Sequence, residues 1–151
     1  MLLGMGWAIV QASQRALAAE LSSDEIDKLD IALQAEDARL RAEARKWLEQ
    51  NGESWLKWQF CEQLNNHGGL LQFMTSRNHR SSSLWELLAF LANQSKGTHG
   101  VAFVHDDESV DYPRSYRIWR IFEGSVSEHD DPFFSPMIAP DPFGGDLTIY
   151  R

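Results

Sequence analysis

Cysteine and long apolar runs are scarce in this sequence. Its 151 residues include one cysteine, Cys61, which excludes an internal disulfide framework and a cysteine-rich zinc site. No run reaches 18 apolar residues, so we expect no transmembrane helix. The apolar start, Met1 to Val10, lacks the basic residues of a secretory signal, because the first arginine is Arg15. We interpret it as a β-strand in a cytoplasmic protein; the alternative is a signal cleaved near the alanine-rich residues 16–19.

Basic residues are also few. Fourteen Lys and Arg face 22 Asp and Glu, giving a formal net charge of −8. This balance argues against direct binding of nucleic acid or anionic membranes, which needs clustered Lys and Arg. The chain does have six Trp and eight Phe, enough aromatic residues to build a packed core. The length predicts one domain spanning residues 1–151.

Two segments have the apolar spacing of helices. The first begins at a possible capping box, Ser22-x-x-Glu25, and ends near Gly52. Glu36 and Asp37 interrupt its apolar stripe, so we expect the middle of this helix to overhang the core or face solvent. The second begins at Ser83-x-x-Glu86 and ends at residues 95–97. The apolar stripes of the two helices are Ile26, Leu29, Leu33, Leu40, Ala44 and Trp47, and Leu84, Leu87, Leu88 and Leu91.

The other segments alternate with period two or end at turn residues. From residue 56 to 64, apolar side chains alternate with polar ones, and a turn at 65–69 leads to a strand over 70–76. Further strands are expected at 100–105, at 116–122 and around Val126, with a turn at Glu123-Gly124. From Pro132 onward we expect an irregular segment packed along the body, because four of the five prolines lie there. The pattern predicts an α+β fold, a largely antiparallel sheet with two main helices packed on one face.

Motifs of catalysis are absent. The sequence has no G-x-S-x-G elbow, P-loop or G-x-G-x-x-G, and we expect Cys61 to be an inert, buried or half-buried thiol. Residues 77–80, Arg-Asn-His-Arg, are expected to form a polar connection with arginines paired to acids; a phosphate site at the following helix is the alternative.

His105 and His129 lie among carboxylates, which would suit a small metal-dependent hydrolase. However, adjacent strand residues point to opposite faces, so we expect neither a metal nor a cofactor.

Acidic residues concentrate between His105 and Asp131. This stretch holds eight acids and three arginines, a local excess of five negative charges. Such a field speeds encounter with a basic partner, and interleaved aromatic residues could anchor it. The candidate partner-binding residues are Asp106, Asp107, Glu108, Asp111, Tyr112, Glu128, Asp130 and Asp131.

Several short segments, in order, resemble the bacterial immunity protein 7 family of polymorphic toxin systems. They are Gly6-Trp7-Ala8-Ile9, residues 77–80, residues 100–108, residues 116–124, and Asp131-Pro132-Phe133-Phe134-Ser135-Pro136. The resemblance covers almost the whole chain. Two departures are Met5, where the family has a histidine, and Met137, where it has a cysteine.

The resemblance implies a non-enzymatic protein of interbacterial competition that binds a cognate toxin domain and neutralises it by occlusion. We expect it to act as a monomer in a 1:1 complex. Many toxins of such systems are nucleases with basic clefts, and an acidic inhibitor would compete with nucleic acid for their Lys and Arg. Two alternatives stay open. One is the metal-dependent hydrolase using His105 and His129, and the other is an adaptor that assembles through the Ile26–Trp47 helix.

Overall fold

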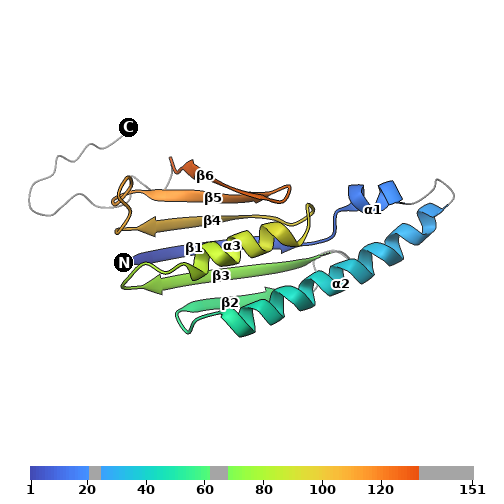
Figure 1. Ribbon diagram of the computed structural model, residues 1–151, viewed down its shortest axis with the longest axis horizontal. Coiled ribbons are helices and arrows are strands. Elements are labelled where there is room, and N and C mark those ends of the chain that lie inside the picture. The colour runs from blue at the N-terminus through green and yellow to red at the C-terminus, as the bar shows by residue number, and fades with distance from the viewer. Residues whose placement is uncertain (21–24, 62–67, 133–151) are drawn as a thin grey trace, which may run out of the picture.

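Six strands form one sheet in which every neighbouring pair is antiparallel (Figure 1). The computed structural model describes residues 1–20, 25–61 and 68–132. The apolar N-terminal run forms a strand, as predicted, and the order β2-β3-β1-β4-β5-β6 places that strand at the centre of the sheet. Their bounds are β1 Leu2–Val10, β2 Leu56–Cys61, β3 Gly69–Arg77, β4 His99–Asp106, β5 Tyr116–Phe122 and β6 Ser125–Asp130.

The two main helices, α2 (Ile26–Asn51) and α3 (Ser83–Gln94), cover the same face of the sheet (Figure 1). This arrangement confirms the predicted α+β class. A short helix that the sequence reading missed, α1 (Gln14–Glu20), includes the alanine-rich residues 16–19. No described helix covers the opposite side of the sheet, which we call the open face.

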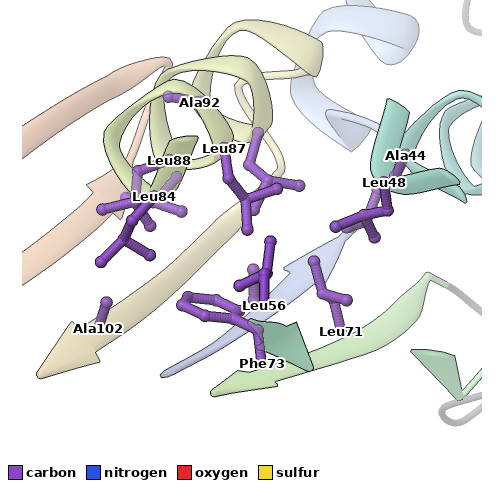
Figure 2. Packing of buried hydrophobic residues seen from close by; sticks show 14 of the residues in the cluster. Ala44, Leu48, Leu56, Leu71, Phe73, Leu84, Leu87, Leu88, Ala92 and Ala102 are labelled. Atoms are coloured by element: carbon purple, nitrogen blue, oxygen red, sulfur yellow. The ribbon is translucent and has the colours of Figure 1, made fainter. Parts of the chain in front are cut away.

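The core lies between the two helices and the sheet. Figure 2 shows side chains of α2 and α3 directed toward strand residues such as Leu71, Phe73 and Ala102. The four leucines of the α3 stripe are fully buried, and so are Leu40 and Ala44 of α2. Alternation divides each strand between the two faces. In β1, for example, Ala8 is buried beneath the helices while Trp7 is exposed on the open face.

Gly4 allows α3 to approach the central strand closely. A Cβ atom at this position would lie 2.8 Å from Cγ2 of Thr75 and 3.3 Å from Cδ2 of Leu84. Both distances are shorter than ordinary carbon–carbon contact. A side chain at Gly4 would therefore push against the first turn of the helix.

The β5–β6 hairpin turns at Glu123 and Gly124, as predicted. Both residues have positive φ, 48° and 78°, which is the geometry of a type I′ turn between twisted strands. The tight turn fixes the register, so Arg117 lies opposite Asp130 and Trp119 lies opposite Glu128. This pairing determines which acidic residues of β6 meet Arg117 of β5.

Asp37 corrects the expectation that the middle of the long helix overhangs the core or faces solvent. It is 2% exposed and accepts two backbone hydrogen bonds, from the Ala12 N–H at 2.5 Å and the Gly68 N–H at 2.9 Å. The nearby Arg41 donates to the Gly68 carbonyl at 3.2 Å. Asp37 therefore joins α2 to the segment after β1 and to the residue before β3.

Two local expectations about Ser83 and Cys61 are wrong. The capping box at Ser83 is wrong, because Ser82 is the N-cap and Ser83 Oγ donates to Glu53 at 2.7 Å. Cys61 is exposed rather than buried or half-buried. The expected features at Ser22, at residues 62–67 and beyond Pro132 lie outside the described residues.

None of the described helices is long and apolar enough to cross a membrane.

Candidate functional site

A pocket of about 240 Å³ lies where the loop after β4 meets β5, β6 and α3. That volume is below the roughly 300–1,000 Å³ typical of small-molecule sites, so it suits a partner's side chain better than a cofactor. Both segments of the predicted acidic stretch contribute to it. Its lining includes Arg80, Trp85, Asp106, Val110, Asp111, Tyr112, Arg117, Trp119 and Glu128.

Arg117 organises the β6 side of the pocket. Its Nε donates to Glu128 at 2.9 Å, and its Nη1 donates to Asp130. Its guanidinium carbon lies 3.9 Å from the centre of the Tyr112 ring, a cation–π contact. Burial alone would lower the pKa of Arg117, but the hydrogen bonds to the two carboxylates outweigh it and raise that pKa. The arginine is therefore a fixed charge that orients two acids and one aromatic ring.

Arg80 organises the side of the pocket opposite β6. It lies 3.2 Å from Asp106 and sits 5.2 Å from the centre of a ring of Trp85. Trp85 in turn meets Trp119 edge to face at 6.1 Å between ring centroids. The pocket thus has two tryptophans inside it and one clamped arginine on each side.

The loop after β4 is tied down through Glu108. This side chain accepts from the Arg80 N–H at 3.0 Å and lies 3.2 Å from Nδ1 of His79. The two interactions lower the pKa of Glu108, the backbone hydrogen bond having the larger effect. Asp107 accepts from the amino nitrogen of Met1. The Arg77–Glu53 ion pair at 3.0 Å and the Arg80–Asp106 ion pair confirm that the arginines of residues 77–80 pair with acids.

Of the eight predicted binding residues, four line the pocket, namely Asp106, Asp111, Tyr112 and Glu128. Asp130 adjoins it through Arg117 and is 90% exposed along its side chain. Asp107 and Glu108 lie on the loop after β4 but do not line the pocket. Asp131 is only 5% exposed, and Asp106 is also buried. Whether any of them contacts a partner stays a prediction.

Apart from Tyr112, the non-acidic side chains of the pocket were not predicted as binding residues. Arg117 was counted only as a positive charge within the acidic stretch. The predicted turn at Glu123-Gly124 was nevertheless enough to place Arg117 opposite Asp130. Arg80 and Trp85 lie far from the acidic stretch in sequence. Val110, which is 93% exposed on the rim, carries no sequence signal that would have identified it.

The histidines of the metal-hydrolase alternative are separated from the strand carboxylates. His105 and His129 occupy open-face positions, whereas Asp106, Glu128 and Asp130 alternate to the helix-covered side. Within residues 1–20, 25–61 and 68–132, no group of three His, Cys, Asp or Glu side chains could hold a metal ion. The alternative therefore gains no support from the geometry.

The adaptor alternative needs an apolar helix face free for a partner. In α2, however, the stripe residues Leu33, Leu40 and Ala44 are buried in the core, so the face proposed for assembly is already used in folding.

The family model described as Immunity protein 7 matches residues 1–141. No curated protein and no solved structure gives a significant match. The family match includes all the strands, helices and pocket residues of the described part of the chain. The chain belongs to the Immunity protein 7 family.

Proposed function

We propose that this immunity protein binds one cognate toxin domain in the cytoplasm of the producing cell and neutralises it by occluding its active region. Binding is through the pocket and its acidic surroundings, which we call the acidic site: Asp106, Asp107, Glu108, Val110, Asp111, Tyr112, Glu128, Asp130 and Asp131. The protein acts as a stoichiometric inhibitor and needs no cofactor. The observation that carries this proposal is the convergence of two acidic segments on one pocket with an exposed apolar rim.

The geometry supports an interface in which a basic side chain of the toxin enters the pocket region. Asp111 and Asp130 are exposed and offer carboxylates to such a side chain. Val110 and Tyr112 offer apolar surface next to those charges. Buried aromatic and arginine anchors surrounded by polar groups are the usual source of affinity in protein interfaces. A nuclease fits this chemistry because its substrate-binding residues are basic.

Calorimetric titration of the toxin domain encoded beside this gene tests the proposal. We expect a 1:1 complex with nanomolar affinity, about −12 kcal/mol, together with loss of toxin activity at equimolar ratio. The double variant Asp111→Asn/Asp130→Asn should raise Kd at least tenfold, because it removes two exposed charges without changing side-chain size. Asp30→Asn, on the exposed side of α2, is the matched control and should bind like the wild type.

The salt dependence separates the parts of the proposal. Affinity that falls steeply with added salt supports a basic toxin surface. Tight binding that is insensitive to salt and to both substitutions retains the immunity function but rejects the acidic site. No binding at micromolar concentration rejects this toxin domain as the partner.

A further inference from the structure

The open face differs sharply in charge from the rest of the protein. Among the described residues of the six strands, the positions that point away from the helices include no Asp or Glu. They do include Lys57, Arg120 and three histidines, His99, His105 and His129. In a chain of net charge −8, this face has only basic and neutral side chains.

The strand registers align apolar side chains across the middle of this face. Following the pairing from β2 to β6, one transverse row includes four successive apolar residues with a basic or titratable residue at each end. The row reads Lys57, Met74, Met5, Phe103, Ile118 and His129. Met74 is 57% exposed and Met5 is 49% exposed, so these two side chains offer accessible apolar contacts to a partner.

Next to this row lies a depression of about 520 Å³. Trp7, Val101 and Phe122 supply apolar walls, and Arg120 and His99 supply polar groups. The Arg120 guanidinium carbon lies 4.2 Å from the centre of the Phe122 ring, and Trp7 meets His99 edge to face. An apolar hollow bordered by positive charge fits an apolar side chain whose neighbours are carboxylates.

The face is large enough for a protein partner. Six strands spaced about 4.8 Å apart, with about seven residues each at 3.3 Å, give roughly 600 Å². A standard protein interface buries about 800 Å² on each partner. The open face can therefore supply most of one partner's share of a stable interface.

We infer that the open face is a second docking surface for the cognate toxin domain, which presents to it an apolar anchor flanked by carboxylates. This inference rests on the proposed function and extends it. The β5–β6 hairpin links the two surfaces, because Glu128 and Asp130 project to its helix side while Arg120 and His129 project to the open face. A toxin that binds both sides of this hairpin contacts acidic residues on the helix side and basic residues on the open face. This difference in charge fixes the toxin's orientation.

Charge reversal on this face provides the first test. In calorimetric titration with the toxin domain encoded beside this gene, Arg120→Glu should raise Kd at least tenfold, while Arg120→Lys should keep most of the affinity. Met74→Gln should raise Kd several-fold. The matched controls, Lys46→Glu and Ile31→Gln, make the same changes on exposed positions of α2 and should leave Kd unchanged. Circular dichroism melts verify that each variant is folded.

Methionine oxidation of the wild-type complex provides a second readout that needs no substitution. Binding should slow peroxide oxidation of Met5 and Met74 on the open face. Protection of Met1, beside Asp107, reports separately on the acidic site. Unchanged Kd in the Arg120 and Met74 variants, with Met5 and Met74 unprotected, would overturn the second surface while leaving the proposed function intact. No wild-type binding would overturn both, and a light-scattering mass of a dimer that Arg120→Glu converts to monomer would assign the face to a second copy instead.

Discussion

Asp37 provides a quantitative test of how the long helix is held to the sheet. Replacing it by alanine removes both acceptors from the backbone N–H groups of Ala12 and Gly68. Both donors belong to buried residues, so water cannot readily replace the lost partner. The cost is therefore that of leaving two buried donors unsatisfied, not that of losing a surface charge.

Each unsatisfied buried donor costs about 1–3 kcal/mol. Two unsatisfied donors destabilise the folded state by about 2–6 kcal/mol. The better helix propensity of alanine offsets roughly 0.6 kcal/mol of this loss. We therefore expect Asp37→Ala to lower the free energy of unfolding by about 2–5 kcal/mol. This is a large part of the roughly 5–15 kcal/mol that stabilises a typical domain.

The measurement is urea denaturation followed by tryptophan fluorescence, with Glu36→Ala as the matched control. Glu36 is the preceding residue, and its carboxylate pairs with Arg39 at 2.6 Å on the exposed side of α2. An exposed pair of this kind contributes at most about 1 kcal/mol. If Asp37→Ala destabilises the protein no more than Glu36→Ala does, the buried acceptor role of Asp37 is refuted.

Two further changes test the loop and the core. The hydrogen bonds that lower the pKa of Glu108 favour the folded state above the ordinary glutamate pKa of 4.5, and this contribution disappears as the pH falls through the lowered pKa. Glu108→Gln should therefore destabilise the protein at pH 7 and progressively less below pH 4.5 in urea titrations; a constant difference would contradict this linkage. Leu88→Ala, at a fully buried position, should cost about 2–5 kcal/mol in the same assay, and a cost below that of Ile31→Ala would contradict the assignment of Leu88 to the core.

The sequence was sufficient to predict the sheet and both main helices because their signals are local. Alternation at Leu56, Trp58 and Phe60 predicted strand β2, and the leucine spacing of residues 84–91 predicted α3. The turn at Glu123-Gly124 was also local, since it depends on the backbone freedom of two adjacent residues. Predictions that depend on hydrogen bonds between distant segments failed. Ser83 fits a capping box in sequence, but its hydroxyl donates to Glu53, thirty residues away.

Asp37 also shows that contacts between distant segments cannot be predicted from local spacing. A carboxylate inside an apolar helical stripe suggests an exposed turn of helix, because an isolated buried charge is costly. The two N–H groups that make its burial favourable come from Ala12 and Gly68, 25 and 31 residues away. No spacing rule along α2 could have supplied them. At the pocket, likewise, Arg80 and Trp85 join the acidic stretch only through the packing of α3 on the sheet.

The ion pairs of the acidic site change how its charge should act on a toxin. The sequence from His105 to Asp131 has five excess negative charges. This excess alone suggests that the stretch mainly raises the rate of association with a basic toxin. In the folded protein, Arg117 neutralises part of that field by pairing with Glu128 and Asp130. The same pairing holds those carboxylates in place, so less conformational entropy is lost when a toxin binds them. The acidic site should therefore slow dissociation more than it speeds association, and Asp111→Asn/Asp130→Asn should act mainly on the dissociation rate.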